Sequence, residues 1–373
     1  MKLINLLIKT NRRKKDRLYV YPFSFFIRSE LIKILIPINV TTARQSPSFL
    51  YRRIKLNEKC LNLTGILLLN KPRGLTSHDC VFKIRKLLKT KKVGHTGTLD
   101  PDVSGVLPIC VGRATKIAEY LSGANKTYEG EVTIGYSTTT EDSSGDIVDE
   151  KQVNRELTRF EIENVFSNLL GEINQTPPMY SAVKINGKRL YEYAREGITV
   201  ERPSRTITIY ELLLLEEGDL FKGDNISFRF RVTCSKGTYV RTLAVMIGEM
   251  LGFPAHMSDL TRVSSGSFSI DQCLSFSEIE EKIDNQIIGQ FIEPIESALS
   301  HLPKLKINDT VAKKVKNGAV LPFPDELSHL QASEPFVVID NENSCIAIYN
   351  RHQSKSHLMK PVKVLVNNQE LRT

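Results

Sequence analysis

The chain has 373 residues, with 41% hydrophobic and 25% charged residues, values ordinary for a globular protein of about two domains. It contains no apolar run of about 18 residues, which argues against a membrane-spanning helix. The six cysteines are widely spaced and form no CxxC pair. We therefore expect free thiols in a reducing cytoplasm rather than disulfides or a thiolate metal site.

The net charge of +9 is concentrated at the start of the chain. Residues 1–62 contain 14 Lys/Arg and 3 Asp/Glu, whereas the remainder contains 37 and 39. Three interpretations of this basic extension are open: an organelle-targeting peptide, a disordered arm that holds RNA, or sequence upstream of the true start. We expect it to be disordered or absent from the native protein. Nucleic-acid binding by the rest of the chain must then depend on local basic patches.

Regular structure is expected to begin at GILLLNKPRG (65–74), which predicts a strand ending in a turn. The next segment predicts a helix with Ser77 as its N-cap. The loop GHTGTLDP (94–101) follows this helix. Its two glycines and closing proline favour a shaped turn that fixes one carboxylate, Asp100.

The central part of the chain predicts strands and amphipathic helices. The clearest strands cover residues 207–215 and 226–234, and the second alternates apolar and polar residues. Three further signals are a helix over residues 158–170 with Phe160 on its apolar face, a tight hairpin at Asn186-Gly187, and a helix that follows GTYVRT and ends at Gly252.

The pattern changes near residue 300, after which a small, mostly β module is expected over residues 303–373. Strands and helices mix without regular βαβ alternation. The predicted fold class is therefore α+β, with a largely antiparallel sheet flanked by helices.

Several familiar chemistries find no support. Ser77, His78 and Asp79 have the residue types of a hydrolase triad, but adjacent residues cannot align as nucleophile, base and orienting acid. No HExxH, GxxxxGK[ST] or GxGxxG pattern is present, so neither a metal nor a nucleotide cofactor is expected. Asp100 and Asp102 are too close in sequence to flank a glycosidic bond from opposite sides.

Asp100 taken alone is most simply a turn-forming residue. Two other segments give it partners: KTY supplies Tyr128, and CSKGTYVRT (234–242) supplies Tyr239 and Arg241. An arginine beside the aspartate would keep the carboxylate ionised. The tyrosines would offer flat faces on which a base can stack.

These segments carry a resemblance. GILLLNKPRGLTSHD, GHTGTLDPDVSGVLPICVGRATK, KTYEGEV, QTPPMYSAVKINGKRLYEYAREG and CSKGTYVRTLAVMIGE occur in this order. Together they closely resemble the TruB family of tRNA pseudouridine synthases over about residues 63–300. The resemblance implies a pseudouridine synthase catalytic domain over 63–300 and a shortened PUA-like module over 303–373. It also implies isomerisation of uridine 55 in the T-arm loop of tRNA, without metal or cofactor.

The resemblance also implies roles for individual residues. Asp100 matches the catalytic aspartate, Tyr128 the tyrosine that stacks on the target base, and Arg241 the arginine paired with the aspartate. The implied substrate-binding residues are His95, which enters the T-loop, the active-site aromatic Tyr239, the apolar pocket residue Leu260, and Lys71 of the turn before the first helix.

RNA affinity is expected from lysines near the catalytic loop, and we predict that Lys91 and Lys92 contact phosphates. A flipped uridine would enter the site, with His95 filling the space it leaves. Three paths are open for Asp100: attack on C1′, attack on C6, or proton removal at the 2′ position.

Two alternatives remain at this point, a catalytically silent RNA chaperone for the T arm and an enzyme of the related guide-RNA-dependent branch. The short C-terminal module favours the stand-alone form. We expect a cytoplasmic monomer that binds tRNA and no membrane.

Overall fold

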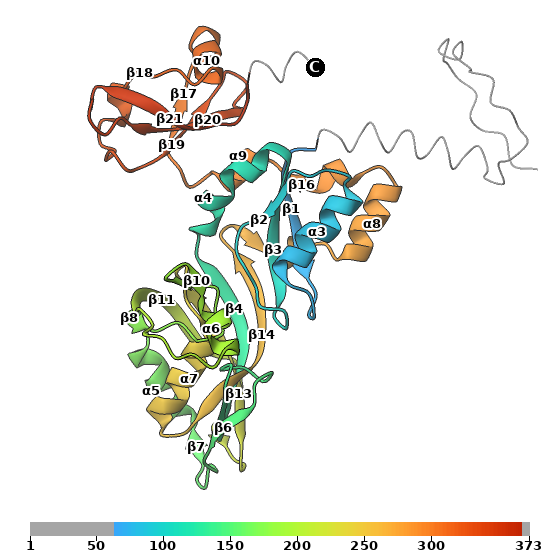
Figure 1. The fold of residues 1–373 in the computed structure, drawn as a ribbon, viewed down its shortest axis with the longest axis vertical. Helices are drawn as coiled ribbons and strands as arrows, with labels where there is room; N and C mark the ends of the chain where they lie inside the picture. Colours follow the sequence, from blue (N-terminus) through green and yellow to red (C-terminus); the bar gives the residue numbers. More distant parts are fainter. Residues whose placement is uncertain (1–62, 368–373) are drawn as a thin grey trace, which may run out of the picture. The chain divides into compact units, whose positions relative to one another are not determined.

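The computed structural model describes residues 63–367, and the basic extension over residues 1–62 lies outside this range. Its main feature is a ten-stranded sheet with the order β16-β1-β3-β14-β4-β13-β11-β8, with β2 paired to β3 and β15 to β14 (Figure 1). Its strands are β1 (Gly65–Lys71), β2 (Val93–His95), β3 (Ser104–Val111), β4 (Lys126–Ile134), β8 (Gly171–Gln175), β11 (Arg205–Leu214), β13 (Ile226–Cys234), β14 (Ala255–Ser265), β15 (Phe268–Ser269) and β16 (Ile292–Glu293).

All pairs in this sheet are antiparallel except β3 with β14, which run parallel at Ser104 and Gly105. The predicted α+β class with a largely antiparallel sheet is therefore confirmed. Three two-stranded sheets accompany the main sheet in the described residues: β5 (Tyr136–Thr138) with β6 (Ile147–Glu150), β7 (Leu157–Thr158) with β12 (Leu220–Phe221), and β9 (Lys184–Ile185) with β10 (Lys188–Arg189).

Helices cover the sheet in two separate groups (Figure 1). Helices α5 (Arg159–Asn168) and α7 (Val240–Leu251) pack with β4, β11 and β13 in one apolar cluster. Helices α3 (Ser77–Leu87) and α8 (Phe276–Asp284) pack with β1 and β3 in another. The shorter helices are α4 (Ala118–Ser122), which follows a 3₁₀ turn, α6 (Leu190–Arg195) and α9 (Ile295–Ala298).

The local predictions were mostly confirmed. Strand β13 buries alternate residues, α7 ends at Gly252 with φ 86°, and Asn186-Gly187 joins β9 to β10 with both residues at positive φ. Phe160 was predicted wrongly, because it is 77% exposed while Ile162, Val165 and Phe166 form the buried face of α5.

Ser77 was also predicted wrongly as the N-cap of α3. Thr76 caps this helix, since its hydroxyl accepts from the Asp79 amide while the Asp79 carboxylate accepts from the Thr76 amide. Ser77 is buried instead, and its hydroxyl exchanges hydrogen bonds with the backbone of Leu99. The residue that was expected to begin the helix therefore fixes the loop that carries Asp100.

The C-terminal residues form the expected β module. Its five-stranded sheet has the order β17-β19-β20-β21-β18 and is accompanied by helix α10 (Asp309–Lys316). The strands are β17 (Lys304–Lys306), β18 (Leu321–Pro322), β19 (Phe336–Ile339), β20 (Cys345–Arg351) and β21 (Leu358–Val364).

Candidate active site

The loop between β2 and β3 places Asp100 beside the middle of the main sheet. Ser77 holds one side of the loop, because the Leu99 amide donates to its hydroxyl at 2.9 Å. Lys71 holds the other side, donating from Nζ to the carbonyls of Pro101 at 2.9 Å and Val103 at 2.7 Å. The backbone on both sides of the aspartate is thus tied to buried side chains.

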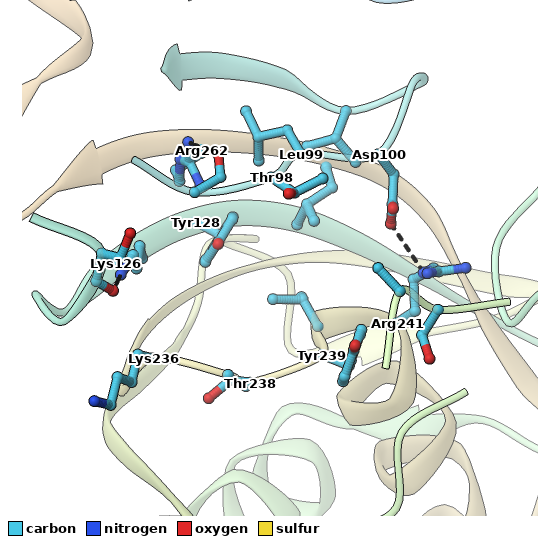
Figure 2. A pocket seen from close by; sticks show the side chains of 18 of the residues that line it. Thr98, Leu99, Asp100, Lys126, Tyr128, Lys236, Thr238, Tyr239, Arg241 and Arg262 are labelled. Atoms are coloured by element: carbon cyan, nitrogen blue, oxygen red, sulfur yellow. Dashed lines mark hydrogen bonds and ion pairs between the residues drawn. The ribbon is translucent and has the colours of Figure 1, made fainter. Parts of the chain in front are cut away.

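Asp100 forms an ion pair with Arg241, whose Nε lies 3.1 Å from Oδ2 (Figure 2). Arg241 is itself nearly buried and is fixed by further acceptors. Its Nη1 donates to the Thr140 carbonyl at 2.9 Å and lies 3.3 Å from an Asp142 carboxylate oxygen, while Nη2 donates to the Tyr180 carbonyl at 2.9 Å. One guanidinium therefore lies between two carboxylates with its orientation set by backbone oxygens.

Asp100 keeps 44% of its side-chain surface open to the site, although protein surrounds it on most sides. Burial raises the pKa of this carboxyl above its ordinary value, and the adjacent Arg241 charge opposes the rise. Asp142 adds to the rise because it is a second negative charge nearby. The site holds a carboxylate whose proton affinity is increased but which has a fixed cationic partner.

A cavity of about 330 Å³ extends from Asp100 between β4, β14 and the segment before α7. Its walls include Tyr128, Tyr239 and Leu260, so these predicted residues meet Asp100 and Arg241 at one cavity. Figure 2 shows Asp100 and Arg241 at one end, with Lys126 and Lys236 at the other. This volume lies within the range of small-ligand sites.

Tyr128 lies at the wall of this cavity beside a buried arginine. Burial raises the pKa of the Tyr128 hydroxyl, and the charge and hydrogen bond of Arg262 offset part of that rise. Arg262 is 1% exposed and donates from Nε to the Val106 carbonyl at 2.7 Å. The tyrosine is thus neutral at neutral pH and is held next to a fixed cation.

The other predicted site residues lie outside the cavity wall. His95 ends β2 one residue before the cavity-lining Thr96, and burial lowers its pKa, so the ring is neutral at neutral pH. Lys71 is fully buried and supports the loop through its hydrogen bonds to Pro101 and Val103. Lys91 and Lys92 are exposed on the segment that leads into β2.

Some charged residues of the site were not singled out from the sequence, among them Asp142, Arg262 and Arg205. Asp142 lies in the polar loop TTTEDSSGD, where nothing local distinguishes it from its neighbours. Arg262 had a usable signal, because it follows Leu260 by two residues and so falls on the buried face of β14. Arg205 begins β11 and lines the cavity far from Asp100 in sequence.

Within residues 63–367, no group of three or more His, Cys, Asp and Glu side chains is placed to hold a metal ion. No helix in this range has both the length and the hydropathy needed to cross a membrane.

Solved structures show the same arrangement of elements. The match to the crystal structure of a Cbf5-Nop10-Gar1 complex has a TM-score of 0.62 and 28% identity, covering 84% of this chain and 88% of that one. A substrate-bound H/ACA RNP structure matches with a TM-score of 0.58 and 25% identity, covering 85% and 82%. The mixed sheet and its helices define a pseudouridine synthase fold.

Sequence comparison gives the family. A model of the TruB family pseudouridylate synthase N-terminal domain matches residues 85–240, and a model of the tRNA pseudouridylate synthase B C-terminal domain matches residues 241–300. tRNA pseudouridine synthase B of Bacillus cytotoxicus is 60% identical over 311 residues, which are 83% of this chain and 100% of the relative. The Geobacillus thermodenitrificans enzyme is 59% identical over 302 residues, 81% and 99% of the two chains. The chain therefore belongs to the TruB family of pseudouridylate synthases, and its reaction is an isomerisation.

Proposed function

We propose that this chain isomerises uridine 55 in the T-arm loop of tRNA to pseudouridine. The observation that carries the proposal is the Asp100–Arg241 pair at the end of a cavity that Tyr128, Tyr239 and Leu260 also line. The similar Bacillus and Geobacillus proteins are tRNA pseudouridine synthases, which supports tRNA as the substrate.

The chemistry requires one carboxylate at the junction of sugar and base. The bond from ribose C1′ to N1 breaks, the uracil turns, and C1′ forms a bond to C5. C5 then loses a proton and N1 gains one, so the product has the same composition as the substrate. Asp100 would begin this sequence by attack on C1′, by attack on C6, or as a base at the 2′ position. Arg241 would keep it ionised and aimed into the cavity.

The remaining cavity residues would hold the flipped base. Tyr128 would stack on the uracil, with Tyr239 and Leu260 as further walls. His95, neutral and next to the loop, would fill the space that the flipped nucleotide leaves in the RNA. Exposed Lys91 and Lys92 would contact phosphates near the T arm.

The proposal extends to the organisation of the protein. Residues 63–300 would form the catalytic domain, and residues 303–373 a PUA-like module that assists RNA binding. We propose a cytoplasmic monomer.

The test is conversion of a T-arm stem-loop that carries labelled uridine at position 55, with no second RNA present. We expect pseudouridine from the wild type and a loss of at least about 10²-fold in rate with Asp100→Asn, because the carboxylate does the chemistry. Asp102→Asn is the matched control, because Asp102 is an exposed carboxylate of the same loop, and it should retain most of the activity.

Each other result has a distinct meaning. Conversion by Asp100→Asn at the wild-type rate would remove Asp100 from its role. Tight binding by the wild type with no conversion would favour the RNA chaperone. Conversion only after a guide RNA is added would favour the guide-dependent branch.

A further inference from the structure

The lining of the cavity contains positive charge that has no acidic partner in residues 63–367. Within residues 63–367, five basic residues line the cavity: Lys126, Arg205, Lys236, Arg241 and Arg262. Asp100 is the only carboxylate that the described part of the chain contributes to the lining, and it is paired with Arg241.

Two more of these cations donate hydrogen bonds to backbone carbonyl oxygens. Lys126 donates to the carbonyls of Ser122 at 2.6 Å and Ala124 at 2.5 Å, and its burial lowers its pKa to about 8. Arg262 donates to the Val106 carbonyl. Arg205 and Lys236 remain, and the side chain of neither forms an ion pair or hydrogen bond with any residue in the described part of the chain.

Arg205 is held in place although it has no acidic partner. Its guanidinium lies 4.8 Å from the centre of the Tyr239 ring, a cation–π contact. The backbone of Tyr239 is fixed in turn by the buried Gln175, whose amide group exchanges hydrogen bonds with it at 2.7 and 3.0 Å. The arginine therefore rests on a ring whose own position is set by the sheet.

The neighbouring loop approaches the guanidinium at a glycine. A Cβ at Gly237 would lie 3.2 Å from Nη1 of Arg205, so a side chain there would crowd the group. The loop is rigid at its start, because Ser235 exchanges hydrogen bonds with the backbone of Thr208 at 2.9 Å. The Arg205 Nε is buried and has no hydrogen-bond partner, which is costly unless a ligand supplies an acceptor.

We propose that Arg205, assisted by Lys236, binds a backbone phosphate of the RNA strand adjacent to the flipped uridine. A fixed guanidinium with free N–H donors suits a phosphodiester, which offers two charged oxygens. With the phosphate held beside Tyr239 and Asp100 elsewhere on the same cavity wall, the nucleotide is positioned between the two groups. The inference rests on the proposed function, since it requires an RNA strand whose target base enters this cavity.

The test combines a protein change with a matching RNA change. Binding is measured for stem-loops in which the phosphate 5′ or 3′ of uridine 55 is replaced by an uncharged methylphosphonate. All proteins also carry Asp100→Asn so that binding is not followed by turnover. Arg205→Gln should weaken binding of the unmodified RNA about tenfold and reduce the slope of log K against log salt by about 1.

The decisive result is that the effect of the methylphosphonate on binding disappears in Arg205→Gln. At one of the two positions, the methylphosphonate should weaken binding to the parent protein about tenfold, and Arg205→Gln should bind the two RNAs equally. Arg205→Lys keeps the charge and should retain a difference between them. Arg231→Gln is the matched control, because this arginine pairs with Glu129 at 2.5 Å on the opposite face of β13.

The proposal is overturned if the methylphosphonate weakens Arg205→Gln as much as the parent at both positions. It is also overturned if Arg205→Lys behaves like Arg205→Gln while both remain folded by circular dichroism. Failure of the proposed function is a separate outcome, since it appears as wild-type protein that makes no pseudouridine in unmodified RNA.

Discussion

Asp100 is held by neighbours that act on its charge in opposite directions. Burial and the nearby Asp142 carboxylate raise its pKa, whereas the Arg241 guanidinium at 3.1 Å lowers it. In the proposed mechanism only the ionised form attacks or accepts a proton, so the balance of these neighbours would set how far the activity extends into acid solution.

We predict that the pH profile of single-turnover rate reports this balance. Activity should fall as the pH falls through the Asp100 pKa, which lies above the ordinary carboxyl value. Arg241→Met removes the group that lowers this pKa, so its acid limb should move to higher pH. Asp142→Asn removes a group that raises the pKa, so its acid limb should move to lower pH. If the acid limb lay at the same pH in the wild type, Arg241→Met and Asp142→Asn, Asp100 would not control the pH profile.

The individual site residues were predictable to the extent that they lie in recognisable segments. Asp100, Tyr128 and Arg241 each lie in a short motif that could be identified by resemblance, and the structure brings all three to one cavity. Asp142 and Arg205 carry no such local signal. Their importance comes from what touches them, Arg241 in one case and Tyr239 in the other, and such contacts form only in the folded chain.

Among the elements, the parallel pairing of β3 with β14 brings the start of β3, which follows the Asp100 loop, next to Arg262 of β14. Gly105 of β3 lies opposite Arg262 of β14 and has φ 109°. A Cβ at residue 105 would lie 2.2 Å from the Arg262 carbonyl oxygen and 2.8 Å from its amide nitrogen. The close approach of these two strands therefore depends on the absence of a side chain.

Gly105→Ala should lower the free energy of unfolding by about 3 kcal/mol or more, from a strained backbone and an overpacked crossing. Urea denaturation of the full chain measures this. The control is Gly94→Ala, which meets nothing within 4 Å and has no positive φ, and should change the free energy by less than about 1 kcal/mol. Similar values for the two variants would mean that the strands separate easily at this crossing.

The helices and strands with a regular pattern were predictable, and the pairing between distant strands was not. Alternation identified β13, and the apolar spacing and final glycine identified α7. The Ser77 and Phe160 errors arose where a tertiary contact or solvent outweighed a local preference, since Ser77 bonds the Leu99 backbone. The β3–β14 pairing joins segments about 150 residues apart, and periodicity carries no information on such partners.

On the scale of the whole molecule, one apolar cluster joins the main sheet to the C-terminal module. Cys110 of β3 and Cys345 of β20 both belong to it and are 0% and 4% exposed. The backbone amide of Cys345 also donates to the Glu296 carboxylate at 2.6 Å. The two parts should therefore lose their packing together.

Thiol labelling at pH 8 tests this coupling. Burial raises the pKa of both cysteines to about 12, so only about 10⁻⁴ of each is thiolate in the folded protein and reaction is slow. With increasing urea, both should become reactive in one transition, as read by mass spectrometry of the labelled peptides. Labelling of Cys345 well before Cys110 would show that the module unfolds alone.

The pairing of β1 with β16 has a consequence for how such a protein can be extended. Ile66 lies opposite Glu293 and Leu67 opposite Ile292, so the first and last strands of the main sheet are neighbours at its border. The cavity is formed further inside, by β4, β14 and the loop before β3. Segments joined before β1 or after β16 therefore begin away from the reacting groups. Further RNA-binding domains could therefore be fused at this edge of the sheet without changing the residues that line the cavity.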